Sequence, residues 1–329
     1  MKLVIKKMDD DGRLGMVPGF LETPWEIVVA DSDDLPAFER ALDGADALIS
    51  MSWTGPVPKA PSLRLLQTPG AGTDAVDVSL LAPQTAVCNC FEHEIGISEY
   101  VLGAMLEWVI GLRRMDATLR RGDWTGSYLC GPRHAELYGK TLAILGYGRI
   151  GRESARRALA FGMRVLACSR TPKDADPLVG RVAGMDALLP TLAPADFVLV
   201  TLPLDDSTRS LIDRRAFAAM KPGAVIVNVS RGPVIDEQAL YDALAARRIG
   251  GAIIDVWYGY PAQGERHAAP ARLPFHELDN ILMTPHASGW TDGLLPRRHR
   301  AIAENLNRLA RGEPLVNVVH APRAEQPSR

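Results

Sequence analysis

One segment near the middle of this 329-residue chain constrains its fold more than any other. Residues 141–145 form an apolar run typical of a buried strand, and residues 150–162 have the pattern of a helix. Between them lies the motif G-x-G-x-x-G. Gly146 would allow a tight turn, Gly148 a close approach of the backbone to a pyrophosphate, and Gly151 close packing of the helix on the strand. The segment therefore predicts a βαβ unit that binds a nicotinamide dinucleotide.

The residues after the next predicted strand, 163–168, indicate which dinucleotide is bound. An NAD site usually carries Asp or Glu here to accept hydrogen bonds from the ribose, but the first carboxylate after this strand is Asp174. Arg170 and Lys173 instead provide cations that suit a 2′-phosphate. Because Arg also stacks on adenine without selecting that phosphate, NADP(H) is favoured and NAD(H) remains possible. Besides the three glycines, the cofactor-binding residues expected here are Arg149, Ile150, Ser169, Arg170 and Thr171.

Strands alternate with helices along the chain, which is typical of doubly wound parallel sheets. The first series of predicted strands covers 3–7, 25–30, 45–50, 63–68 and 86–90, and the second covers 141–145, 163–168, 197–201, 224–228, 252–256 and 281–284. Helices are predicted over 35–42, 97–121, 150–162 and 294–311. A chain of this length that is 47% hydrophobic can bury the cores of two domains. We expect two α/β domains with a cleft between them: residues 1–97 with 288–329, and a Rossmann dinucleotide-binding domain over 98–287.

Composition excludes several classes of partner. The net charge is −2 and no basic block is present, so neither nucleic acid nor an anionic membrane is expected to bind. The apolar stretch at the N-terminus is too short for a signal peptide, and the sequence predicts a cytoplasmic protein. The four cysteines form no C-x-x-C pair, and Glu92-His93-Glu94 lacks a second histidine at helical spacing. No metal site is therefore predicted.

Three further patches each accompany a strand of the second series. Residues 228–236 contain Arg231, residues 251–257 contain Asp255, and residues 284–289 contain His286. With the glycine-rich turn, these patches make the chain resemble the D-isomer-specific 2-hydroxyacid dehydrogenase family from about residue 63 to 319. The resemblance implies a flavodoxin-like substrate domain beside the Rossmann domain. It also implies an NAD(P)-dependent oxidoreductase of EC 1.1.1 type that transfers hydride between the cofactor and a small 2-keto or 2-hydroxy acid.

The resemblance assigns the reaction to two residues. Arg231 would hold the substrate carboxylate and carbonyl oxygen with its planar fork, and His286 would donate or remove the proton. Backbone amides of the other domain would bind the carboxylate, and an indole there would wall off a bulky substituent. The substrate-binding residues so implied are Gly70, Ala71, Gly72 and Trp53.

The resemblance also assigns residues to the cofactor and to the partner surface. Asp255 would accept a hydrogen bond from the nicotinamide carboxamide or from Arg231, and Val229 would present its backbone to the nicotinamide. The remaining cofactor-lining residues are Thr201, Pro203 and Gly289. The helix over 97–121 matches the dimerisation arm of the family, which implies a homodimer.

One position departs from the family pattern. The family usually places a glutamate after the fifth strand, in D-V-aromatic-x-x-E-P, where this chain has Tyr260. A carboxylate beside imidazole raises its pKa, whereas a neutral phenol orients the ring without supplying a charge. Either His286 works as a proton donor with Tyr260, Asp292 or Glu265 as its partner, or hydride transfer needs no proton transfer. The second alternative resembles the formate dehydrogenase branch, whose D-V-W-x-x-Q-P segment also lacks the acid. A non-catalytic, dinucleotide-sensing scaffold is a third hypothesis.

Overall fold

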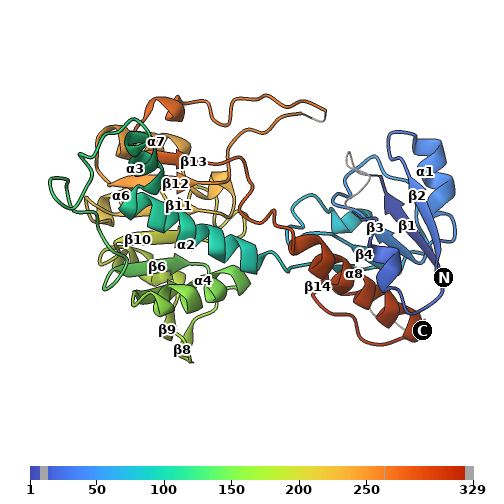
Figure 1. The fold of residues 1–329 in the computed structure, drawn as a ribbon. Helices are drawn as coiled ribbons and strands as arrows, with labels where there is room; N and C mark the ends of the chain where they lie inside the picture. Colours follow the sequence, from blue (N-terminus) through green and yellow to red (C-terminus); the bar gives the residue numbers. More distant parts are fainter. Residues whose placement is uncertain (8–13, 263, 323–329) are drawn as a thin grey trace. The chain divides into compact units, whose positions relative to one another are not determined.

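The chain divides into two compact units in the computed structural model, which describes residues 1–7, 14–262 and 264–322 (Figure 1). Unit 1 contains residues 1–92 and 291–329, and unit 2 contains residues 93–290. These divisions lie a few residues from the predicted boundaries at 97/98 and 287/288. Each unit is α/β and is built on one largely parallel sheet, as the alternating pattern predicts.

Unit 2 contains an eight-stranded sheet in the order β13-β12-β11-β10-β6-β7-β9-β8. Its strands are β6 (Thr141–Leu145), β7 (Arg164–Cys168), β8 (Lys173–Asp176), β9 (Gly180–Ala183), β10 (Phe197–Val200), β11 (Val225–Asn228), β12 (Gly251–Ile254) and β13 (Ile281–Met283). All neighbours pair in parallel except β8 and β9, which form an antiparallel hairpin at the edge. The sequence analysis missed this hairpin because its two strands are short and mostly exposed, and apolar and polar residues do not alternate clearly along them.

Helices cover both faces of this sheet. In β6, Ala143 and Leu145 enter one core while Leu142 and Ile144 enter the other, because successive strand residues point to opposite faces. The first core also receives side chains of α5 (Leu188–Leu192), α6 (Arg214–Ala219) and α7 (Glu237–Ala245). The second receives side chains of α2 (Glu94–Ile110) and α4 (Arg149–Ala160). Unit 2 is therefore doubly wound.

The prediction of a single helix over residues 97–121 is wrong. The chain instead forms α2 and α3 (Leu112–Leu119), which meet at a 52° bend. Gly111 between them has a φ of +73°, the left-handed conformation that ends helices and that glycine adopts without strain. Within the described residues, no single helix has both the length and the apolarity of a membrane span; α2 and α3 meet those criteria only jointly, across this bend.

Unit 1 contains a six-stranded sheet in the order β14-β5-β4-β3-β1-β2. Its strands are β1 (Lys2–Lys6), β2 (Glu26–Ala30), β3 (Ala47–Ile49), β4 (Leu65–Gln67), β5 (Ala86–Cys88) and β14 (Val318–His320). Helix α1 (Leu35–Leu42) packs on one face and α8 (Leu294–Arg311) on the other, both at their predicted positions. The antiparallel edge strand β14 was not predicted. Short 3₁₀ turns complete the two units: η1 (Val17–Phe20), η2 (Val78–Leu80), η3 (Met185–Ala187), η4 (Gly232–Val234) and η5 (Phe275–Glu277).

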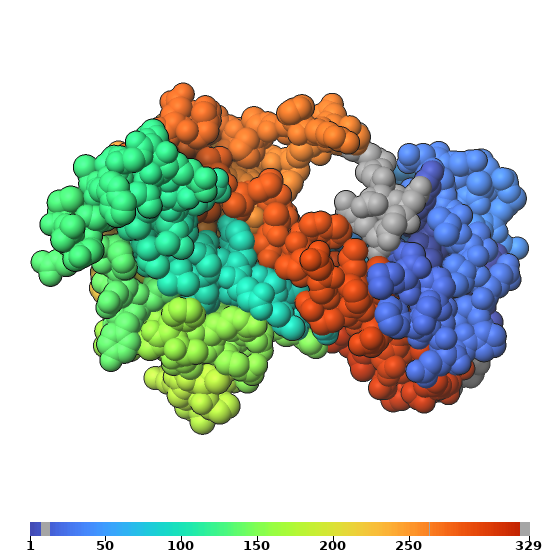
Figure 2. Space-filling model, in the orientation of Figure 1, coloured from blue at the N-terminus to red at the C-terminus, as the bar shows by residue number. Residues whose placement is uncertain are grey.

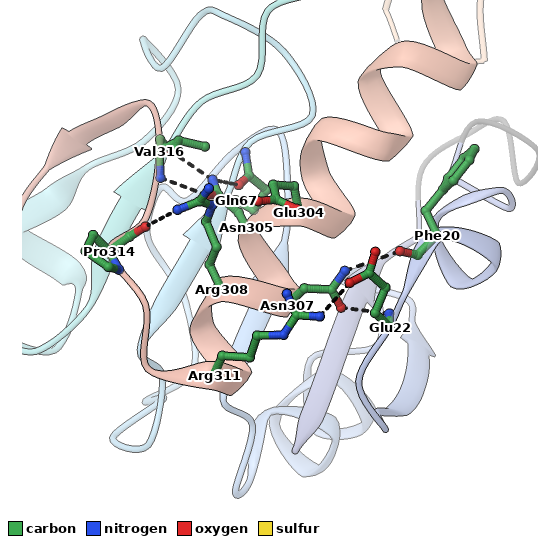
Figure 3. A network of polar contacts seen from close by, with 10 residues as sticks. All are labelled: Phe20, Glu22, Gln67, Glu304, Asn305, Asn307, Arg308, Arg311, Pro314 and Val316. Carbon is green, nitrogen blue, oxygen red and sulfur yellow. Dashed lines mark hydrogen bonds and ion pairs between the residues drawn. The ribbon is translucent and has the colours of Figure 1, made fainter.

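Buried amide side chains of α8 join both ends of the chain into unit 1 (Figure 3). The Asn305 amide donates to Oε1 of Gln67 at 2.8 Å, and its oxygen accepts from the Val316 amide at 2.9 Å. The Asn307 oxygen accepts from the backbone of Glu22 at 2.9 Å. Because Asn305 and Asn307 are each only 1% exposed, these bonds satisfy groups that would otherwise destabilise the fold.

Candidate active site

The glycine-rich turn between β6 and α4 has the geometry that a dinucleotide needs. Gly146 has a φ of +99°, and a Cβ there would lie 2.8 Å from the Thr201 carbonyl. A Cβ on Gly151 would lie 2.4 Å from the Gly146 oxygen, whereas one on Gly148 would meet none of the described atoms within 4 Å. No side chain of the described residues caps the first amides of α4, which begins at Arg149. The turn thus has room and donors for a pyrophosphate, so the residues present fit the cofactor.

The chain after β10 runs beside this turn. The Thr201 hydroxyl donates to the Gly146 carbonyl, and the Pro203 carbonyl accepts from the Thr208 hydroxyl at 2.7 Å. Two residues after Pro203, Asp205 accepts a hydrogen bond from the Ser207 hydroxyl. That bond, with a smaller contribution from Arg170, lowers the pKa of Asp205 below its usual value.

Arg170 faces this carboxylate. Its guanidinium lies 3.5 Å from Oδ2 of Asp205, and 80% of its side chain is exposed. The neighbouring Ser169 hydroxyl donates to the Thr171 carbonyl at 2.7 Å. The sequence analysis did not include Asp205, because nothing in the local sequence signals a contact between residues on different strand ends.

Arg231 follows β11 and is brought to the segment after β12 by a close backbone approach. A Cβ on Gly232 would lie 2.3 Å from the Trp257 carbonyl oxygen, so only glycine fits. The Arg231 guanidinium donates to the Ser230 carbonyl at 2.8 Å, and the Asn228 amide donates to the Arg231 carbonyl at 3.0 Å. Val229, between them, is buried. The end of β11 therefore positions Arg231 through its backbone.

Asp255 anchors the loop that carries His286. Its side chain is fully buried and accepts hydrogen bonds from the Thr284 hydroxyl at 2.6 Å, the Ala287 amide at 2.9 Å and the Ser288 amide at 3.0 Å. Burial raises the pKa of this carboxyl, but the hydrogen bonds outweigh it and keep the pKa below its usual value. Both oxygens of the carboxylate thus serve the loop, a role that the sequence analysis did not foresee.

His286 and Tyr260 form a direct pair. Nδ1 of His286 lies 3.0 Å from the Tyr260 hydroxyl, which also accepts the Trp257 amide at 3.0 Å. Surrounding protein atoms lower the pKa of His286 although part of its ring is exposed; Asp255 raises this pKa and Arg231 lowers it. Burial raises the pKa of Tyr260, while the Trp257 bond and Arg231 lower it. The neutral form of each side chain is favoured.

A pocket opens beside this pair. It has a volume of about 720 Å³ and is lined by Tyr260, Arg266, His267 and residues of the 283–285 segment. The loop that follows β12 and lines this pocket lies at the surface of unit 2 (Figure 2, orange). Glu265, one predicted substitute for the missing acid, is exposed and is not among the charges that shift the pKa of His286. Asp292, the other, belongs to unit 1.

Three residues that were predicted to bind the cofactor or the substrate make packing or hydrogen-bond contacts within their own unit. Gly289 packs on the start of α2, where a Cβ would lie 3.3 Å from Ile97. In unit 1 the Gly70 carbonyl accepts from the Cys90 amide at 2.9 Å. Trp53 is only 2% exposed, and its indole packs in the core of unit 1.

The turn over residues 70–72 keeps donors available for an anion. The Ala71 carbonyl accepts from the Asn89 amide group at 2.9 Å, which fixes the turn. Among the described residues, the backbone amides of Gly70, Ala71 and Gly72 have no hydrogen-bond acceptor. Successive free amides of this kind bind carboxylates.

Comparisons with known proteins agree with this geometry. The family model described as D-isomer specific 2-hydroxyacid dehydrogenase, NAD binding domain, matches residues 102–288, which is more than half of the chain. A D-3-phosphoglycerate dehydrogenase of Methanocaldococcus jannaschii is 33% identical over 313 residues, covering 93% of this chain and 57% of that protein. A hydroxypyruvate reductase of Thermotoga maritima is 34% identical over 232 residues, covering 70% of this chain and 72% of that protein.

A solved structure shows the same likeness. A D-isomer specific 2-hydroxyacid dehydrogenase family protein from Aeromonas salmonicida superposes with a TM-score of 0.76 at 25% identity, covering 97% of this chain and 98% of that chain. The chain spans little more than half the length of the M. jannaschii relative. From the match over residues 102–288 and these relatives, the chain belongs to the D-isomer specific 2-hydroxyacid dehydrogenase family, whose members transfer hydride between NAD(P)H and 2-keto or 2-hydroxy acids.

Proposed function

We propose that this protein reduces a small 2-keto acid to the 2-hydroxy acid with NAD(P)H. The observation that carries the proposal is the pair formed by His286 and Tyr260, with Arg231 close enough to shift the pKa of both. This cluster lies at the carboxyl ends of the strands of unit 2, the same edge that carries the glycine-rich turn.

Each residue of the cluster has a distinct task. The Arg231 fork binds the carboxylate and carbonyl oxygen of the substrate and stabilises negative charge on that oxygen. His286 gives the oxygen its proton, and Asp255 holds the loop that presents the imidazole. In unit 1, the amides of residues 70–72 are available to bind a carboxylate. When bound at the glycine-rich turn, the reduced dinucleotide supplies the hydride.

The proposed cofactor preference is NADP(H), with NAD(H) also used. Arg170 is an exposed cation at the end of β7, where an acid would otherwise accept from the ribose. A 2′-phosphate would replace Asp205 as the partner of Arg170, because a phosphate carries more charge and more acceptor oxygens than a carboxylate.

We further propose a cytoplasmic homodimer that uses the 97–121 region. This region exposes Leu112 (57%) and Leu119 (49%), and the segment that follows it extends the apolar surface with Tyr128 (95% exposed) and Leu129 (77%). An exposed apolar segment of this kind is typical of a partner surface. Light scattering of the purified protein should give a molar mass of twice that of the chain. The double variant Tyr128→Asp with Leu129→Asp should have the mass of a single chain.

A substrate panel tests the function. Purified protein is assayed with several 2-keto acids and either NADH or NADPH, and in the reverse direction with formate. Reduction of a 2-keto acid that is lost in His286→Asn supports the proposal. The phenol in place of the usual acid favours one alternative, formate oxidation without proton transfer, which would persist in His286→Asn. Dinucleotide binding without turnover of any substrate would indicate the scaffold instead.

A further inference from the structure

The hydrogen bonds around Tyr260 favour one position for the proton of the neutral His286 ring. The Trp257 amide is only a donor, so the phenolic oxygen accepts from it at 3.0 Å. The phenolic hydrogen is then available to donate to Nδ1 of His286, also at 3.0 Å. A nitrogen that accepts is unprotonated, so the neutral imidazole carries its hydrogen on Nε2.

We propose that Tyr260 and His286 form a two-proton relay in carbonyl reduction, an inference that rests on the proposed function. As the carbonyl of the substrate is reduced, Nε2 of His286 gives its proton to the carbonyl oxygen. The phenolic proton of Tyr260 moves to Nδ1 at the same time. The Nε2–H and Oη–H bonds break, the Nδ1–H bond and the O–H bond of the product form, and a tyrosinate remains.

Charges around the pair favour this route. The Trp257 amide keeps donating to the phenolate, and the positive charge of Arg231 stabilises it, while Asp255 and burial act in the opposite direction. The alkoxide that receives the proton is a stronger base than a phenolate, so the overall transfer is downhill. The same Arg231, together with burial, disfavours an imidazolium. Tyr260 thus supplies a proton where the usual glutamate supplies a charge.

The pocket beside the pair lets the tyrosinate regain its proton. Tyr260 is 50% exposed and lines the cavity of about 720 Å³. Among the described residues that line this cavity, Arg266 and His267 are the other titratable groups. Water in an open pocket of this size can reach the pair after each turnover. Nε2 of His286 then takes a proton from water while Nδ1 returns its proton to the tyrosinate, which restores the starting state.

The first test needs no cofactor and no substrate. In the cofactor-free protein labelled with ¹⁵N-histidine, the chemical shifts of His286 should report the Nε2–H form when the ring is neutral. In Tyr260→Phe the shifts should move toward a mixture of the two tautomers, because nothing then donates to Nδ1. A wild-type ring with its hydrogen on Nδ1 would overturn the relay, whatever the activity.

The second test is the pH dependence of kcat for 2-keto acid reduction. Wild-type protein should hold its rate above the histidine range, whereas Tyr260→Phe should lose about tenfold or more there, since its proton must come from an imidazolium. The proton inventory in mixed H₂O and D₂O should be curved for wild type, with two protons moving, and linear for Tyr260→Phe. Identical profiles and linear inventories in both proteins would overturn the relay.

Two controls separate the relay from a structural role. The partly buried phenol of Tyr258 donates to the Ile235 carbonyl at 3.0 Å, so Tyr258→Phe should keep the wild-type pH profile. A fluorinated tyrosine at position 260 keeps the shape but lowers the phenol pKa, and should move the alkaline limit of kcat to lower pH. An unmoved limit would contradict the relay. If no 2-keto acid is reduced but the Nε2–H form is found, the function and the relay both fail while the hydrogen-bond arrangement stands.

Discussion

The adenosine end of the proposed cofactor site and the reaction end of unit 2 differ in how firmly their polar groups are held. At the adenosine end, Arg170 is 80% exposed and approaches Asp205 only to 3.5 Å. At the reaction end, Asp255 is fully buried with three donors, and Tyr260 bridges the Trp257 amide and the imidazole. Both ends are built on strand termini of the same sheet.

The difference follows from what each end must do. Hydride and proton transfer depend on sub-ångström placement, which only side chains locked by packing and hydrogen bonds provide. Choosing between two dinucleotides needs only a charge near one phosphate, which an exposed side chain can supply. We therefore expect substitutions at the reaction end to have larger effects than those at the adenosine end.

The largest effect is expected from Arg231→Lys. An ammonium cannot form two parallel bonds to the carboxylate and carbonyl oxygen, so kcat/KM for 2-keto acid reduction should fall by about 10²–10³-fold. Dinucleotide affinity, measured by fluorescence titration, should remain within about twofold because the glycine-rich turn is untouched. Arg214→Lys, at an exposed arginine on α6 that pairs with Asp242, is the matched control. Retained reduction in Arg231→Lys would remove this residue from the mechanism.

Asp255→Asn should be the next most damaging. An amide group cannot accept from all three donors, so a buried group loses its partner and the free energy of unfolding should fall by about 2–3 kcal/mol. Because the folded pKa is lowered, the carboxylate stabilises the fold above the unfolded value of about 3.9, and this stabilisation is lost as pH falls through the folded pKa. Denaturant unfolding of both proteins should therefore differ at pH 7 and converge in acid. Asp279→Asn, at an exposed carboxylate, should differ little from wild type at either pH.

Tyr260→Glu should change the titration of His286. In the wild type, burial lowers the histidine pKa below its ordinary 6.5. A carboxylate in place of the phenol favours the imidazolium and should raise the pKa of His286 above 6.5, as followed by NMR. Since the raised pKa belongs to the folded state, the new pair stabilises the fold below pH 6.5 and loses that effect as pH rises through the new value. No shift would mean that the new carboxylate does not face the ring.

Arg170→Ala tests the adenosine end. Loss of one charge-assisted contact should weaken NADPH by about 1–2 kcal/mol, which is about 5- to 30-fold in KM, and leave NADH nearly unchanged. Equal losses for both cofactors would show that Arg170 only stacks on adenine. A loss greater than that of Arg231→Lys would break the comparison between the two ends.

Asp205→Asn should have the smallest effect, and in the opposite direction. Without the carboxylate, Arg170 is free to pair with a 2′-phosphate, so the KM for NADPH should decrease. The decrease should be at most about fivefold, because an exposed ion pair contributes little free energy. The KM for NADH should not decrease with it. Asp206→Asn, at the neighbouring acid, provides the control. Weaker NADPH binding in Asp205→Asn would show that this carboxylate supports the cofactor instead of competing for Arg170.

Features that depend on local sequence were predictable. The strand over 141–145 and the helices over 35–42 and 294–311 lie at their predicted positions, because apolar periodicity and glycine conformations act within a few residues. The bend at Gly111 was missed although glycine signals it, because the apolar pattern continues on both sides. The edge strands over 173–176 and 318–320 were missed because pairing, not periodicity, makes them strands.

By itself, the sequence determined the doubly wound fold, the glycine-rich turn and the identity of the side chains that can carry the chemistry. Only the tertiary structure decided what those side chains touch. The contacts of Asp255 with the loop of His286, of the Tyr260 hydroxyl with Nδ1 of His286 and of Asp205 with Arg170 join residues that are 26 to 35 positions apart. Such contacts exist because parallel strands bring their carboxyl ends to one edge, and no pattern along the chain encodes which atoms then meet there.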